Sequence, residues 1–247
     1  MCIRDSALIG EGKALAELAG EEIFADTLTL QEKIVYLNAL FSSVLNQQLV
    51  ELLRVVAQDP ASRKNMIQKY FRTDTAQKLW NKGTIRKNLS VLETTGNIPS
   101  FFANKFGCME MWLRDLGLFR LQQGTISIAP GAAGLIRRFE DEEKLRSSIY
   151  RLAAMIFLGQ ASKFDSEKDM EQFLSLFRRS YATFALETGV SDIRAIRTFV
   201  CVQLLMKQLV LEEKEFDNVV KLLVTKGIVR SIMLGRDGKP AYITLVT

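Results

Sequence analysis

Apolar residues recur every three or four positions in many parts of this chain, which is the spacing of one face of a helix. Two such runs contain a glycine near their end: NKFGCMEMWLRDLGLFR at Asn104–Arg120 and KEFDNVVKLLVTKGIVR at Lys214–Arg230. Glycine adopts the left-handed backbone conformation without steric cost, so it commonly ends a helix. Each run therefore predicts an amphipathic helix that stops at Gly117 or at Gly227.

Apolar and polar residues alternate after each of these glycines. The segments LFRL and TISIA flank a turn at Gln122-Gln123-Gly124, and the segments IVRSIML and AYITLV flank a turn at Gly235-Arg236-Asp237-Gly238. Alternation is typical of half-buried strands, and short turns that contain glycine connect hairpin strands. The sequence thus predicts a β-hairpin after each helix.

The two helix–hairpin segments align with each other, which indicates an internal repeat. Phe106 pairs with Phe216, and Arg120 pairs with Arg230. Further upstream, Ile34–Phe41 matches Ile149–Ile156. We expect two repeats, a first at residues 26–140 and a second at 141–247. The spacing of Ile9–Leu18 is similar to that of Ile128–Ile136, so residues 1–25 are interpreted as the scar-like MCIRDS followed by the remnant of a truncated preceding unit.

A helix that ends in glycine and leads into a hairpin, as in WLRDLGLFR…GTISIAPGAAGL and LLVTKGIVR…GKPAYITL, resembles a winged-helix domain, the helix-turn-helix variant with a β-hairpin wing. The resemblance covers about Phe101–Ile136 and Asp192–Val246 well and the helices between them loosely. It implies a mainly α fold with small β-hairpins, in which tandem winged-helix units carry helical insertions. Winged helices serve in DNA-binding regulators, in the recognition parts of restriction endonucleases and in protein-only scaffolds.

Positive charge is concentrated in one part of the chain. The net charge is +5, but Leu52–Leu92 alone contains nine basic residues against two acidic ones. Tyr70, Phe71 and Trp80 stand among these charges. Basic residues interleaved with aromatic ones suit a polyanion, because cations neutralise phosphates and release counterions. The alternative is a solvated helical surface whose aromatic side chains point into the core.

The resemblance implies that the helix before each wing enters the major groove of DNA, while the wing contacts phosphate or the minor groove. In the first repeat, asparagine suits adenine, and lysine or arginine suits guanine or phosphate. In the second repeat, four carboxylates at the start of the helix complement its dipole but repel phosphate, so we expect a poor DNA reader there. The wing residues of the second repeat remain candidates for backbone contact, and the alternative for both wings is an exposed tip kept polar for solubility. The candidate nucleic-acid-binding residues are Arg63, Lys64, Lys69, Lys82, Arg86, Lys87, Asn104, Lys105, Arg114, Arg120, Arg236 and Lys239.

Residues for catalysis are not arranged in any recognisable pattern. Histidine is absent, which removes the commonest general base and metal ligand, and the three cysteines form no CxxC pair. No GxxxxGK[ST] segment is present, and the Glu-x-Lys triplets at Glu11, Glu142 and Glu212 do not follow a strand with a suitable aspartate. We therefore expect no enzyme, no catalytic residue, no cofactor and no metal site, unless a catalytic domain is missing from this fragment.

The composition, with 48% hydrophobic and 25% charged residues, is typical of a globular protein. No apolar run reaches the roughly 18 residues that crossing a bilayer requires, so no membrane association is expected. The sparse cysteines fit a reducing, cytoplasmic setting. We expect a protein that binds duplex DNA, as a regulator or as the targeting fragment of a larger restriction or defence protein, from a metagenomic source. The alternative is a protein-interaction scaffold of a chromosome-organising or defence complex, with no direct sequence readout and with a protein partner or a homodimer contact at the second repeat.

Overall fold

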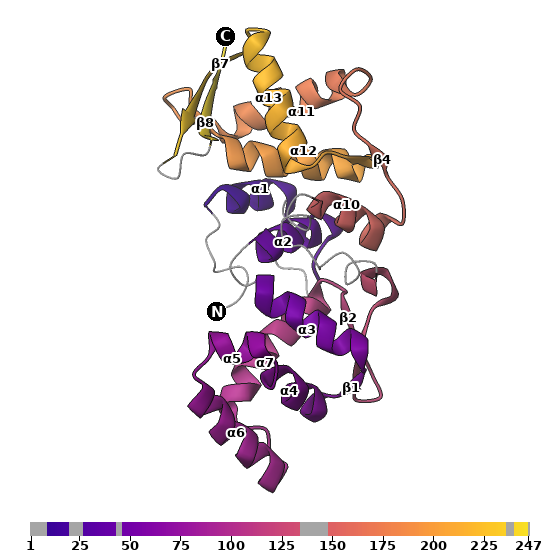
Figure 1. Cartoon of the computed structure of the whole chain (residues 1–247). Helices are drawn as coiled ribbons and strands as arrows, with labels where there is room; N and C mark the ends of the chain where they lie inside the picture. Colours follow the sequence, from indigo (N-terminus) through magenta and orange to yellow (C-terminus); the bar gives the residue numbers. More distant parts are fainter. Residues whose placement is uncertain (1–8, 20–26, 43–45, 134–147, 236–239, 247) are drawn as a thin grey trace. The chain divides into compact units, whose positions relative to one another are not determined.

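The computed structural model describes residues 9–19, 27–42, 46–133, 148–235 and 240–246 (Figure 1). The chain divides into two compact units. The central unit is the continuous segment Leu40–Leu145, and the discontinuous unit combines Met1–Ala39 with Arg146–Thr247. This division differs from the expected consecutive one, because the residues before Leu40 cluster with the second repeat.

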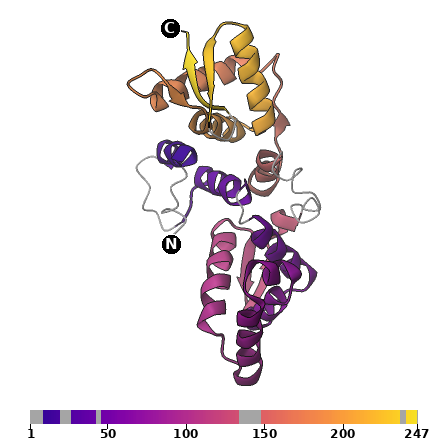
Figure 2. The same cartoon turned by 60° about the vertical axis from the view of Figure 1, so that its left-hand side comes forward.

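The central unit is mainly helical and has one small sheet (Figure 2). The strand order of the sheet is β1-β3-β2, and both pairs are antiparallel. Its elements are α3 (Asn46–Gln58), β1 (Ala61–Ser62), α4 (Arg63–Phe71), α5 (Asp74–Leu79), α6 (Lys82–Thr95), α7 (Ser100–Asp115), β2 (Phe119–Gln122), β3 (Thr125–Ile128) and the 3₁₀ turn η3 (Pro130–Ala132).

The discontinuous unit contains a second sheet with the same kind of order, β5-β8-β7, again with both pairs antiparallel. A two-residue parallel pair joins β4 to β6. The elements are α1 (Ile9–Ala19), α2 (Leu30–Ser42, in which the unit boundary falls), α10 (Ile149–Ala153), the π-helical turn η4 (Ala154–Leu158), β4 (Ser162–Lys163), α11 (Met170–Phe184), β5 (Ser191–Asp192), α12 (Ile193–Met206), β6 (Leu209–Val210), α13 (Glu213–Thr225), β7 (Val229–Leu234) and β8 (Pro240–Leu245). Helix α1 packs against α12 within this unit.

Both units confirm the predicted helix, glycine stop and hairpin. Helices α7 and α13 end just before Gly117 and Gly227, whose φ angles are both +71°. In each case the next N–H reaches back across the last helical turn, from Leu118 to the Leu113 carbonyl at 2.8 Å and from Ile228 to the Leu223 carbonyl at 2.9 Å. These bonds satisfy carbonyls that the end of a helix leaves open.

The first hairpin has a tight two-residue loop at Gln123 and Gly124, with φ angles of +49° and +76°. Positive φ at both loop positions matches the right-handed twist of the two strands, so β2 and β3 stay in register. The loop of the second hairpin, residues 236–239, lies outside the described residues. The prediction of a mainly helical fold with small β-hairpins is confirmed.

Helices α5 and α6 distinguish the two units. Between α4 and α7 of the central unit the chain forms this helix pair, whereas the corresponding segment between α12 and α13 forms only the short strand β6. Thr73 begins α5 by accepting the Ala76 N–H, and Asn81 begins α6 by accepting the Thr84 N–H at 3.1 Å. Gly96, with a φ of +75°, ends α6. Local capping signals therefore define both inserted helices.

The aromatic residues of the basic segment point into the core of the central unit. Tyr70 and Phe71 are fully buried, and the Phe71 ring stacks on Phe102 at 4.2 Å between centroids. Trp80 is half-buried, with its ring 5.3 Å from that of Phe71 and 6.0 Å from that of Tyr70. These side chains stabilise the junction of α4, α5 and α7, and Tyr70 and Phe71 are not available to stack on bases. Among the described residues, no helix has the length and apolar character needed to cross a membrane.

Candidate nucleic-acid interface

The described part of the central unit, residues 40–42 and 46–133, carries twelve basic and six acidic side chains. Carboxylates neutralise some of these cations. Arg63 donates to Glu110 at 2.7 Å, and Lys69 pairs with Asp59. An additional pair joins Arg72 to Glu93. The structure thus places two of the predicted phosphate-binding residues, Arg63 and Lys69, in ion pairs within the unit.

The other cationic candidates of the central unit have no salt bridge to any described residue. Lys64 is half-buried beside Gly96, and the remaining six are exposed. Three of them, Lys82, Arg86 and Lys87, lie on α6, which buries only Ile85 and Leu92 fully. The other three are Lys105 and Arg114 on α7 and Arg120 on β2.

Helix α6 also borders a groove. Lys82 and Arg86, one helical turn apart, line an open groove of about 310 Å³ together with Gln77 of α5 and Ser90. A carboxylate, Glu93, lies at the same groove and is paired with Arg72. Because two cations and two neutral polar groups surround this space, it suits a negatively charged group better than a neutral one.

The outward stripe of α7 is less basic than its sequence suggests. The residues at its centre are Asn104, Cys108, Met111 and Asp115, all exposed. Lys105 and Arg114 lie on the two flanks of this stripe because they are offset by about 100° from its centre. Asn104 is therefore the only predicted base-reading residue at the middle of the solvent face of α7.

The four carboxylates at the start of α13 are engaged inside the discontinuous unit. The Glu212 carboxylate accepts the N–H groups of Tyr150 at 3.2 Å and Arg151 at 2.8 Å, so it caps α10 as well as α13. Glu215 accepts the Glu212 N–H at 3.3 Å and pairs with Lys163 at 2.7 Å. Both carboxylates thus stabilise contacts between secondary-structure elements.

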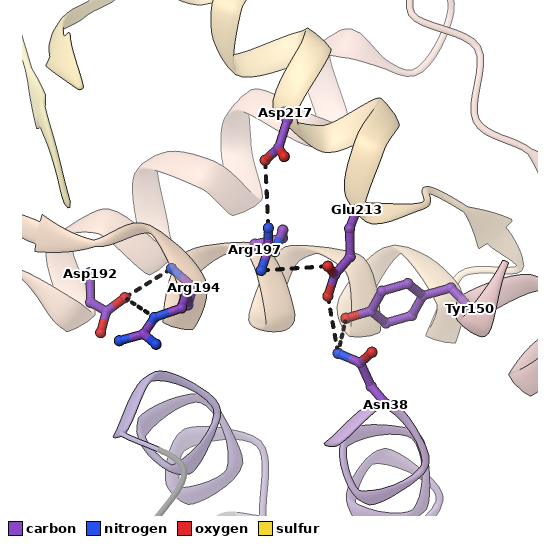
Figure 3. A network of polar contacts seen from close by, with 7 residues as sticks. All are labelled: Asn38, Tyr150, Asp192, Arg194, Arg197, Glu213 and Asp217. Atoms are coloured by element: carbon purple, nitrogen blue, oxygen red, sulfur yellow. Dashed lines mark hydrogen bonds and ion pairs between the residues drawn. The ribbon is translucent and has the colours of Figure 1, made fainter. Parts of the chain in front are cut away.

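Figure 3 shows the other two carboxylates and the arginine between them. Arg197 of α12 pairs with Glu213 at 3.5 Å and with Asp217 at 3.7 Å. Glu213 also accepts the amide of Asn38 at 3.3 Å, and the same amide lies 3.4 Å from the Tyr150 hydroxyl. On a separate part of α12, Asp192 caps the helix by accepting the Arg194 N–H at 2.9 Å (Figure 3). The network joins α2, α10, α12 and α13 within one unit.

A different set of residues forms the solvent face of α13. Lys214, Asn218, Lys221 and Thr225 are exposed, recur at intervals of four and three residues, and form no salt bridge to a described residue. The four carboxylates are engaged in contacts within the unit, so this lysine-bearing face is distinct from them. The helical spacing of the four exposed residues, opposite the buried Phe216, was the signal in the sequence that identifies this face.

The two wings are only partly described. Arg120 and its counterpart Arg230 are exposed at the start of the two hairpins. Arg236 and Lys239 lie outside the described residues. On the hairpin of β7 and β8, the apolar side chains of Met233, Leu234 and Tyr242 are exposed by 41%, 65% and 40%. The second hairpin therefore offers apolar contacts as well as charge.

Burial shifts the pKa values of several groups in the discontinuous unit. It raises the pKa of Glu212 to about 7, although the two N–H groups that the carboxylate accepts act in the opposite direction. Burial also raises the pKa of the Tyr150 hydroxyl and of the Cys201 thiol well above their usual values. A buried neutral thiol is a weak nucleophile. No three His, Cys, Asp or Glu side chains of the described chain are grouped so that they could hold a metal ion.

No protein-family model, curated protein or solved structure matches this chain.

Proposed function

We propose that this protein binds duplex DNA, and that its two repeats are winged-helix units. The observation that carries the proposal is the set of exposed cations of the central unit that have no carboxylate partner among the described residues, above all Lys82, Arg86 and Lys87 on α6. Protein cations that neutralise phosphates release the counterions condensed on DNA, and this release supplies the sequence-independent part of DNA affinity. The shared order of helix, strand, helix, third helix and hairpin supports the winged-helix part of the proposal.

The division of roles between the helices follows from their surfaces. Helix α6 contacts the phosphate backbone of DNA, because its cations lie on a helix that is largely exposed to solvent. Helix α13 provides groove contacts through Lys214, Asn218 and Lys221, since these residue types bind phosphates and base edges. Such a protein serves as a regulator or as the targeting part of a larger restriction or defence protein.

A salt titration tests DNA binding. Affinity of the full chain for a labelled duplex should fall with salt concentration, each phosphate contact adding about 0.9 to the magnitude of the log–log slope. Replacing Arg86 and Lys87 with alanine should flatten this slope by up to roughly two. The control variant Arg178→Ala/Lys207→Ala removes the same charge from exposed positions of the discontinuous unit. A slope that responds equally to both variants would remove α6 from the interface.

Helix α13 is tested separately with Lys214→Ala/Lys221→Ala. We expect duplex affinity to fall by about tenfold or more, since two charge-assisted contacts are lost. Lys168→Ala/Lys207→Ala, which removes two exposed lysines of the same unit outside α13, is the control. Competition between labelled and unlabelled duplexes measures the change. Equal affinities for the two variants would show that the solvent face of α13 does not contact DNA.

A protein-interaction scaffold is the second candidate function. The exposed apolar side chains Met111 on α7 and Met233, Leu234 and Tyr242 on β7 and β8 favour it, because such residues are enriched in protein contacts. In that case the full chain would show no duplex binding even at low salt. That single result would reject DNA binding and leave the scaffold as the better proposal.

A further inference from the structure

A half-open cavity of about 370 Å³ lies in the discontinuous unit, and none of its lining residues belongs to the surfaces proposed for DNA. Its walls come from α10, from the turn η4 and from the parallel strands β4 and β6. The volume falls within the usual range for small-molecule sites, about 300–1,000 Å³. The cavity is therefore large enough for a small organic ligand.

The backbone around this cavity is unusual. The chain leaves α10 through a π-helical turn over Ala154–Leu158, which ends at Gly159 with a φ of +79°. Directly afterwards it enters β4, where the Ser162 N–H donates to the Gln208 carbonyl at 2.8 Å and the Phe164 N–H to the Val210 carbonyl at 2.9 Å. Single π-helical turns are rare and occur frequently at functional sites. The turn separates the helix from the strand pair and so forms one wall of the cavity.

The lining combines two cations with an apolar surface. Arg151 projects from α10 and Lys163 from β4, and the Gln160 amide lies between them in the sequence. Met155 and Val210 are among the apolar residues of the wall. A planar guanidinium binds a carboxylate through two parallel hydrogen bonds, which gives orientation as well as affinity.

The nearby carboxylates already have partners. Glu215 pairs with Lys163 at 2.7 Å, and Glu212 accepts the N–H groups of Tyr150 and Arg151. Neither carboxylate lines the cavity. The Arg151 guanidinium forms no salt bridge to a residue that the structure describes, although it interacts electrostatically with Glu212 and lowers the pKa of that carboxyl. Among the described residues, Arg151 is thus the cation of this cavity that has no direct anionic partner.

We propose that this cavity binds a small organic carboxylate with an apolar tail. Arg151 holds the carboxylate, Lys163 and Gln160 add polar contacts, and the tail packs on Met155 and Val210. The proposal does not depend on DNA binding, because none of these residues belongs to α6 or to the solvent face of α13.

Calorimetric titration of the full chain tests the proposal with three probes: hexanoate, hexylamine and inorganic phosphate. We expect hexanoate to bind, hexylamine not to bind because its charge is reversed, and phosphate to bind at least tenfold more weakly because it has no apolar tail. Arg151→Gln should weaken hexanoate binding by about tenfold or more through the loss of the paired hydrogen bonds. Arg178→Gln, at an exposed position of α11, is the matched control.

A second variant distinguishes the cavity from a surface site. Ala161→Trp fills the cavity without removing a charge, and it should abolish hexanoate binding while the circular-dichroism spectrum stays that of the wild type. Absence of hexanoate binding up to tens of millimolar, equal binding of hexylamine, or an unchanged affinity in Arg151→Gln would each overturn the proposal. Tighter binding of phosphate than of hexanoate would show that the site takes inorganic anions instead.

Discussion

Replacing Phe216 with alanine is expected to destabilise the discontinuous unit by about 3–5 kcal/mol, the usual cost of removing a buried phenyl ring. The Phe216 side chain is fully buried, and its ring centroid lies 5.7 Å from that of Phe173 and 6.2 Å from that of Phe177. It holds α13 against α11, so its loss leaves a cavity between the two helices. Urea denaturation followed by circular dichroism measures the change.

The matched control is Leu222→Ala on the same helix. Leu222 is 39% exposed, so its truncation should lower the free energy of unfolding by about 1 kcal/mol at most, well below the loss expected for Phe216→Ala. We expect a similar loss of stability for Phe106→Ala in the central unit, because Phe106 aligns with Phe216 and is equally buried. Equal losses for Phe216→Ala and Leu222→Ala would contradict the assigned buried face of α13.

Stability of the discontinuous unit should decrease as the pH rises from about 4.5 to 7, because of Glu212. Burial raises the pKa of this carboxyl from 4.5 to about 7, so in that window the folded state holds a proton that the unfolded state has released. A state that binds more protons loses stability when protons are removed, by about 1.4 kcal/mol per pH unit and by up to about 3 kcal/mol over the whole window. Burial also raises the pKa of Asp217, which acts in the same direction.

The variant Glu212→Gln should remove most of this dependence, since glutamine does not titrate and its carbonyl oxygen can still accept an N–H of α10. Urea titrations at half-unit pH steps measure the slope. Glu187→Gln, at an exposed position outside the network, controls for the loss of one carboxyl group. A wild-type stability that rises from pH 5 to pH 7, or an unchanged slope in Glu212→Gln, would show that Glu212 is not the responsible group.

Local features of the fold were predictable from the sequence because they depend on local chemistry. Gly117 and Gly227 end their helices through left-handed backbone, and Gln123-Gly124 supplies the positive φ angles of a hairpin loop. The strands β1 and β5 were not predicted, since two residues carry no periodicity. Each is a strand only because β3 or β8 pairs with it.

The candidate site was less predictable, because it depends on which side chains meet across the fold. Nine basic residues in one segment indicated a cationic surface, but the sequence does not show that Glu110 and Asp59 neutralise Arg63 and Lys69. The sequence also does not show that Glu213 of α13 pairs with Arg197 of α12, whereas its neighbour Lys214 is exposed.

The interruption of the discontinuous unit by the central one affects the order of folding. Asn38 and Glu213, which meet through a hydrogen bond, are 175 positions apart in the chain. Contacts at such separations form late, because a long loop must be closed before they contribute. The central unit is continuous, so its core can assemble on the ribosome while α10 to α13 are still unsynthesised. Until α10 and α13 have been synthesised, Asn38 of α2 lacks both Tyr150 and Glu213, so α2 is exposed to chaperones for the whole time that the central unit is being made.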